Sequence, residues 1–178
     1  MNEQINMATA KFPPDSVQLR DVRLRDLATF FEQQLDETAI QMAAFTAKDP
    51  ADRDAFMARW TRILSDDNIT KKTILQEGKV AGHVVCFQRL GRPEITYWIG
   101  KPYWGRGLAT RALTAMLAYV TQRPLYARVA KDNYPSRRVL EKCGFCICGE
   151  DRGFSNARGR EVEEYILKLD AAGERQAP

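Results

Sequence analysis

Residues 104 to 110 of this 178-residue chain have the residue types and spacing of an anion-binding loop. The segment, here called the glycine loop, reads Trp-Gly-Arg-Gly-Leu-Ala-Thr and is followed by apolar residues at helical spacing. A strand-like stretch, residues 94 to 99, precedes it. The first backbone N–H groups of a helix lack intrahelical partners and carry partial positive charge, and glycine lets a ligand approach them closely. We therefore predict a phosphate-binding site at the glycine loop.

The two glycines alone do not identify the ligand. A mononucleotide-binding loop ends in Gly-Lys-Ser or Gly-Lys-Thr, which this sequence does not contain, and a dinucleotide-binding loop requires a third glycine where Thr110 stands. A dinucleotide-dependent enzyme is therefore disfavoured. Two glycines before a helix are also compatible with a simple tight turn, and that alternative stays open at this point.

Two spaced motifs carry a resemblance to a known family. Trp104-x-x-Gly107-x-Ala109 resembles the pyrophosphate-binding motif Q/R-x-x-G-x-G/A of the GNAT acetyltransferase superfamily. The segment from Asn133 to Phe145 resembles the second signature of its ribosomal-protein alanine N-acetyltransferase branch. The resemblance covers roughly residues 17 to 169. It implies the GNAT fold, an α+β arrangement with a central mixed twisted sheet flanked by helices, and an N-acetyltransferase that uses acetyl-coenzyme A.

The same resemblance implies which residues contact acetyl-coenzyme A. Asn133 is expected to hydrogen-bond the pantetheine arm, and nearby arginines are expected to neutralise the phosphates. No metal is implied. The expected cofactor-binding residues are Ile99, Trp104, Gly105, Arg106, Gly107, Leu108, Ala109, Thr110, Asn133, Ser136 and Arg138.

Acetyl transfer from a thioester requires a neutral amine and benefits from a proton donor for the leaving thiolate. Glu94 resembles the position where some GNAT enzymes keep a general base. Many members carry a proton-donating tyrosine where this chain has Leu140, so Ser136 and Tyr134 are the candidate acids. Ser136 matches the serine of the ribosomal-protein branch. The missing tyrosine leaves one alternative open, a non-catalytic module that binds acyl-coenzyme A.

The acceptor amine is not identified by the sequence. The resemblance places the first helical pair at one wall of the acceptor site, where Glu32, Asp36 and Glu37 could attract a cationic amine or form a solvated face. A protein N-terminus and a small-molecule amine both stay open. The net charge of +4 falls short of the dense basic surface of a nucleic-acid binder.

Hydrophobic periodicity predicts a single domain over residues 17–170, with flexible tails at 1–16 and 171–178. We expect one helical region over residues 23–42, interrupted near Asp36, and a second helix that begins at an N-cap at Asp49. Two further helices are expected over 107–121 and 133–143. The expected strands are residues 17–22, 69–77, 80–89, 94–99, 125–130, 145–150 and 161–169, with 94–99 and 125–130 parallel.

The four cysteines and the single histidine are candidate metal ligands or catalytic groups. Cys143, Cys146 and Cys148 suggest a zinc half-site or a redox pair, but a second suitably spaced ligand pair is missing. We therefore expect the cysteines to be small core residues. His83 lies in mid-strand without an orienting partner nearby in sequence, which argues against a catalytic base. Without a signal peptide or an apolar span, we expect a cytoplasmic protein, monomeric or homodimeric, that binds no membrane.

Overall fold

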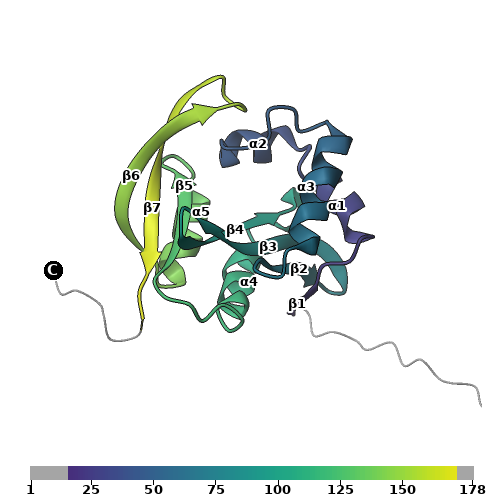
Figure 1. The fold of residues 1–178 in the computed structure, drawn as a ribbon, viewed down its shortest axis with the longest axis horizontal. Coiled ribbons are helices and arrows are strands. Elements are labelled where there is room, and N and C mark those ends of the chain that lie inside the picture. The colour runs from purple at the N-terminus through teal and green to yellow at the C-terminus, as the bar shows by residue number, and fades with distance from the viewer. Residues whose placement is uncertain (1–15, 172–178) are drawn as a thin grey trace, which may run out of the picture.

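The computed structural model describes residues 16 to 171, which form one mixed seven-stranded sheet with helices on both faces (Figure 1). The strand order is β1-β2-β3-β4-β5-β7-β6, and every neighbouring pair is antiparallel except β4 and β5. Apart from Ser16 and Ala171, the two predicted tails lie outside the described residues. The strands are β1 (Val17–Asp21), β2 (Thr70–Gln76), β3 (Lys79–Arg89), β4 (Arg92–Ile99), β5 (Leu125–Ala130), β6 (Cys146–Ser155) and β7 (Arg160–Leu169).

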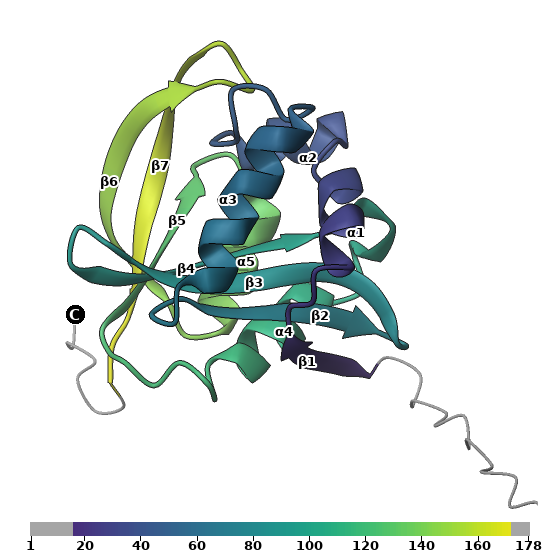
Figure 2. The same ribbon diagram turned by 45° about the vertical axis from the view of Figure 1, so that its right-hand side comes forward.

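Helices cover both faces of the sheet (Figure 2). On one face α1 and α3 pack through Phe30 and Trp60 against β3. On the other face α4 and α5 contribute Leu113 and Leu140 to the larger core cluster. A short 3-10 helix, Lys101–Tyr103, joins β4 to the glycine loop. The helices are α1 (Asp26–Gln33), α2 (Glu37–Ala43), α3 (Arg53–Ser65), α4 (Leu108–Met116) and α5 (Tyr134–Lys142).

The parallel strands β4 and β5 separate along their length. Their register contains one pair, Glu94 with Tyr126, near the start of both strands. β5 pairs with β7 over all six of its residues, from Leu125 to Ala130. The last residues of β4 therefore pair with β3 alone, which leaves an open strand edge facing β5. Open edges of this kind can bind an extended chain through backbone hydrogen bonds.

Three helix predictions are refined by the structure. The break near Asp36 is confirmed, because its carboxylate accepts a hydrogen bond from Ala39 N at 2.9 Å and caps α2. The predicted N-cap at Asp49 is wrong, because Asp52 caps α3 and Asp49 closes the preceding turn. Helix α4 ends at Met116, earlier than expected, because the next residues form the tighter i to i+3 bonds of a frayed helix end.

The prediction that the cysteines are core residues is wrong for two of them. Cys146 and Cys148 are both exposed. They lie on β6, which is the last strand in the sheet order and has one paired edge. A register shift between Ile147 and Gly149 also displaces this part of the strand from regular pairing. The position of a strand at the sheet edge cannot be inferred from its own sequence, and this explains the error.

The turn between β6 and β7 holds the connection between α2 and α3. Ser155 Oγ donates to Ala44 O at 2.5 Å in a buried contact, and Gln41 Nε2 donates to Ala157 O at 2.6 Å. Figure 2 shows the tip of this hairpin beside that connection. Contacts between segments more than 100 residues apart in sequence therefore hold the connection between α2 and α3, residues 44 to 50, in place.

Candidate active site

The glycine loop has the backbone geometry that anion binding requires. Gly105 and Gly107 have φ angles of +76° and +69°, a region that favours glycine. Among the described residues, none of the backbone N–H groups from 105 to 110 donates a hydrogen bond, and Arg111 N is the first to bond back, to Gly107 O. A Cβ atom at Gly105 would meet no heavy atom within 4 Å. Six free N–H groups and open space at a helix start fit a phosphate group.

The glycine loop forms one wall of a cleft of about 650 Å³, here called the β4–α5 cleft. The end of β4, the start of α5 and the end of α2 form its other walls. All the predicted cofactor-binding residues line it except Arg106, and Tyr134 lines it as well. Trp104 is fixed there by its indole N–H, which donates to Ile99 O at 2.7 Å. The basic side chains of Arg138 and Lys142 add positive charge suited to phosphates.

Asn133 ties α5 to α2. Its Oδ1 accepts a hydrogen bond from Ser136 N at 3.2 Å and caps α5, and its Nδ2 donates to Met42 O at 3.1 Å. Each side of the amide is thus engaged within the protein, and one Nδ2 hydrogen is left for a ligand. The predicted bond from Asn133 to the pantetheine arm stays a prediction.

Ser136 forms a hydroxyl pair with Tyr97. The Oη atom of Tyr97 and the Oγ atom of Ser136 are 2.8 Å apart. Burial raises the pKa of Tyr97 to about 12, so its hydroxyl keeps its proton and can donate. The other candidate acid, Tyr134, is 59% exposed and lies beneath the guanidinium of Arg137. The sequence reasoning missed Tyr97, whose only sequence signal is its place in a strand that leads into the glycine loop.

A second cleft, of about 500 Å³, lies between α3 and the sheet and is here called the α3–β4 cleft. Its walls are mainly aromatic and aliphatic, and Tyr97 and Trp98 line both clefts. His83 lines it between the rings of Phe30 and Trp60, whose centroids lie 4.7 and 4.9 Å away. Burial, and then the charge of Arg59, lower the pKa of His83 to about 3, so the ring is neutral. The two clefts meet at Tyr97 and Trp98.

Glu94 lies outside the lining of both clefts. Its side chain is 12% exposed and lies 3.8 Å from the guanidinium of Arg89. Burial raises its pKa, which moves the carboxyl group toward the range of a general base. Strand alternation places Glu94 on the same face as Thr96 and Trp98, which line the α3–β4 cleft. Glu94 is thus two residues from the edge of that cleft and on the opposite face from Tyr97.

The acidic residues of the first helical pair lie outside the two clefts described. Glu32, Asp36 and Glu37 line neither cleft. Asp36 caps α2 and lies 3.3 Å from the ammonium group of Lys101. Residues 16 to 171 contain no group of three or more His, Cys, Asp and Glu side chains placed to hold a metal ion. No helix in this described part is long and apolar enough to span a membrane.

A helix start with an open glycine loop, parted parallel strands and a second cleft on the opposite face of the sheet make up the candidate site. Comparison with known proteins identifies the class. A family model described as an acetyltransferase (GNAT) domain matches residues 16–146, and the chain belongs to this GNAT acetyltransferase family. The predicted family and the predicted α+β fold are therefore confirmed.

Individual relatives agree with the family. An 86-residue stretch is 31% identical to p20, an uncharacterized N-acetyltransferase of Bacillus licheniformis, and the match spans 46% of this chain and 48% of that protein. The chain thus covers about half the length of this relative. YdaF of Bacillus subtilis strain 168, provisionally named a ribosomal N-acetyltransferase, is 28% identical over 145 residues, which are 74% of this chain and 79% of YdaF.

The fold also matches solved structures. RimJ of Mycobacterium smegmatis, solved in complex with CoA-disulfide, superposes with a TM-score of 0.74 at 24% sequence identity. The match covers 93% of this chain and 87% of that one.

Proposed function

We propose that this protein transfers the acetyl group of acetyl-coenzyme A to a primary amine. The observation that carries the proposal is the run of backbone N–H groups from residues 105 to 110 that have no partner among the described residues, all but Arg106 belonging to residues that line the β4–α5 cleft. Their position suits the pyrophosphate, and the open edge of β4 suits the extended pantetheine arm. The thioester would then lie near Tyr97 and Trp98, where the two clefts meet.

The chemistry assigned to this junction is a direct acyl transfer. The amine nitrogen attacks the thioester carbon, a C–N bond forms, and the C–S bond breaks. The leaving sulfur takes a proton from Ser136 Oγ, and Tyr97 Oη, at 2.8 Å, passes its proton to Ser136 and regains one from solvent, so that both hydroxyls are restored. The proton lost by the amine passes through water along the exposed Thr96 to Glu94, which releases it to solvent.

A hydroxyl pair at the junction supports catalysis over the alternative of a non-catalytic acyl-coenzyme A-binding module. A binding module has no need for a proton donor beside the thioester. In the second signature the tyrosine of many members is replaced by Leu140, which is buried in the core. Tyr97 on β4 supplies a phenolic hydroxyl from a different element.

The acceptor, oligomeric state and location are further parts of the proposal. The name of YdaF points to a ribosomal acceptor, with which a protein N-terminus would agree, and small amines are the other kind of acceptor. We propose a cytoplasmic protein that is a monomer or a homodimer. The four free cysteines among the described residues suit a reducing compartment.

Release of free coenzyme A tests the proposal. The protein is mixed with acetyl-coenzyme A and a panel of amines, and the thiol is followed with a colorimetric reagent. We expect release that depends on the amine and exceeds the rate without amine. Tight binding of acetyl-coenzyme A without turnover on any acceptor would instead favour the non-catalytic module.

A further inference from the structure

The α3–β4 cleft is lined by a positive charge that no carboxylate among the described residues 16 to 171 neutralises. Arg59 lies on α3 and lines this cleft. Within residues 16 to 171, no carboxylate oxygen lies within 4 Å of its guanidinium. Its one hydrogen bond runs from Nη2 to Gln34 Oε1 at 3.4 Å, and Gln34 is held by Pro50 O at 2.8 Å. Arg59 is exposed at the rim of the cleft, where its guanidinium stacks over the ring of Phe56 at 5.8 Å from the centroid. Partial desolvation lowers the pKa of Arg59, and an arginine stays protonated at neutral pH.

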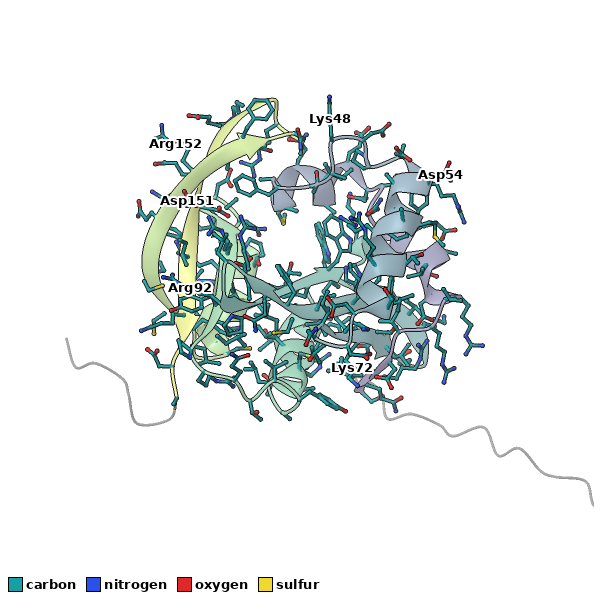
Figure 3. All side chains as sticks on the ribbon, viewed as in Figure 1. Lys48, Asp54, Lys72, Arg92, Asp151 and Arg152 are labelled. Carbon is teal, nitrogen blue, oxygen red and sulfur yellow. The ribbon has the colours of Figure 1, made fainter. Side chains whose placement is uncertain are left out.

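The cleft offers little to a second positive charge. Asp66 is the only carboxylate in its lining, and that group accepts hydrogen bonds from Asn68 N at 2.9 Å and Asn68 Nδ2 at 3.1 Å. His83 is neutral and enclosed by aromatic rings. Figure 3 shows that Lys48, in the connection between α2 and α3, and Asp54, in the first turn of α3, project outward from the surface. A polyamine therefore finds no acidic partner beyond Asp66 in the cleft.

The remaining lining is apolar and aromatic. Trp60 is 1% exposed and Val85 is 5% exposed, and they form the floor of the cleft. The wall made by residues 45 to 47 and Pro50 is fixed by the β6–β7 turn. A volume of about 500 Å³ accommodates one small molecule with a ring or a branched side chain. The other aromatic and large aliphatic lining residues are Phe45, Ile63, Ile69, Phe87, Tyr97 and Trp98.

The position of the charge limits where an anionic group can bind. Arg59 is close enough to His83 to lower its pKa, and His83 is the register partner of Trp98 in the β3–β4 pair. Trp98 marks the junction with the β4–α5 cleft. Arg59, Tyr97 and Trp98 line the same cleft of about 500 Å³, so one small molecule bound there can present a carboxylate to Arg59 and an amine to the junction. A free amino acid carries both groups and an apolar side chain as well.

We propose that the acceptor is a free amino acid with an aromatic or large apolar side chain, whose carboxylate binds Arg59 in the α3–β4 cleft. The inference rests on the proposed acetyl transfer and names the acceptor class for that site. A guanidinium and a carboxylate form a charge-assisted pair that a carboxamide cannot replace. Arg59 therefore selects for the free acid over a peptide or an amide.

A matched set of acceptors and variants tests this assignment. L-Phenylalanine, L-phenylalaninamide, a phenylalanine-initiated peptide amide and spermidine are compared in the coenzyme A-release assay. We expect L-phenylalanine to have a kcat/KM at least about tenfold above each of the others, as one charge-assisted contact supports. Arg59→Met is expected to remove that advantage mainly through a higher KM, with the rate on L-phenylalaninamide unchanged.

Arg53→Met is the matched control. Arg53 is an exposed arginine on the same helix, stacked over Phe31 and absent from the lining of the cleft. This variant should keep the wild-type preference for the free acid. Preference for the peptide amide or spermidine in the wild type, or an equal loss in both variants, would overturn the inference.

A binding measurement separates failure of this inference from failure of the proposed reaction. Two of the three tryptophans, Trp60 and Trp98, line the α3–β4 cleft, so their fluorescence should report occupancy without turnover. We expect a saturable signal with L-phenylalanine that weakens at least about tenfold in Arg59→Met. Such a signal without coenzyme A release would support a free amino acid as the ligand of the cleft and would reject the proposed transfer reaction. Equal titration by L-phenylalaninamide would reject the role of the carboxylate.

Discussion

The hydroxyl pair of Tyr97 and Ser136 joins two elements 39 residues apart in sequence. If Ser136 protonates the leaving sulfur, Ser136→Ala should lower kcat and kcat/KM together by about 10²-fold, within the usual range for general-acid catalysis. Tyr97→Phe should lower kcat by about tenfold, because Ser136 then lacks its donor. Tyr134→Phe is the control, since its exposed ring has no contact with Ser136 among the hydrogen bonds described. Steady-state kinetics with saturating acetyl-coenzyme A would measure these effects.

A loss in Tyr134→Phe with normal Ser136→Ala kinetics would mean that the acid is Tyr134. A drop in acetyl-coenzyme A affinity without a drop in kcat would mean that the pair only shapes the β4–α5 cleft.

Glu94 sets a second expectation at the residue scale. Burial raises its pKa, so its basic form is present above that raised pKa and is lost as the pH falls through it. The wild-type rate should therefore fall on the acidic side. Glu94→Gln should be slower at neutral pH by about 10²-fold, and the deficit should shrink at alkaline pH, where the amine is already neutral. A pH–rate profile measures this change. A deficit that is constant across the profile would assign Glu94 a structural role.

At the scale of elements, one buried carboxylate connects β1, α1 and β2. Asp26 has a 2% exposed side chain, and its oxygens accept hydrogen bonds from Arg20 at 2.6 and 2.8 Å and from Thr73 Oγ1 at 2.7 Å. Burial alone would raise its pKa, but Arg20, the N–H of Arg23 and Thr73 lower it to about 2. These contacts fix α1, which forms part of the support of the α3–β4 cleft.

The lowered pKa of Asp26 predicts how stability changes with pH. The stabilisation is fully present above the unfolded-state value of 3.8 and is lost as the pH falls through about 2. The loss should reach about 2 kcal/mol, from the conversion of a pKa difference into free energy. Urea denaturation at several pH values would measure it. Asp26→Asn should be less stable at neutral pH and should lack this part of the pH dependence, and an unchanged acid profile would contradict the assignment.

The elements that the sequence predicted best are those with strong local signals. Residues 125 to 130 alternate apolar and polar residues and form β5 with those bounds. The helix predicted over 133–143 is confirmed as α5, and its N-cap is Asn133, which precedes a first turn that contains a proline. The predicted cap at Asp49 was wrong by three residues, because Asp49 Oδ1 accepts from Ala51 N in the preceding turn and Asp52 caps α3. Local chemistry therefore predicted element type better than element boundaries.

At the scale of the whole molecule, the two clefts depend on contacts between distant segments. The glycine loop was predictable because its chemistry lies within seven consecutive residues. The α3–β4 cleft was not, because its lining comes from α3, β3, β4 and the connection between α2 and α3. The same distance in sequence hid the pairing of Tyr97 with Ser136 and the position of Arg59. Only the folded sheet, with its parted strands, brings these groups to one junction.

The central claim is that the glycine loop binds the phosphates of acetyl-coenzyme A, and two matched glycines allow a direct test. Gly105 and Gly91 both have a φ angle of +76°, and a Cβ atom at either would meet nothing within 4 Å. Gly105→Ala and Gly91→Ala thus carry the same backbone strain, but only Gly105 lines the β4–α5 cleft.

Calorimetric titration of acetyl-coenzyme A into the wild type and both variants is the decisive measurement. We expect Gly91→Ala to bind like the wild type and Gly105→Ala to bind at least about tenfold more weakly, because the added methyl group occupies the space of the phosphate. Equal affinities in the two variants, or no binding by the wild type, would contradict the claim.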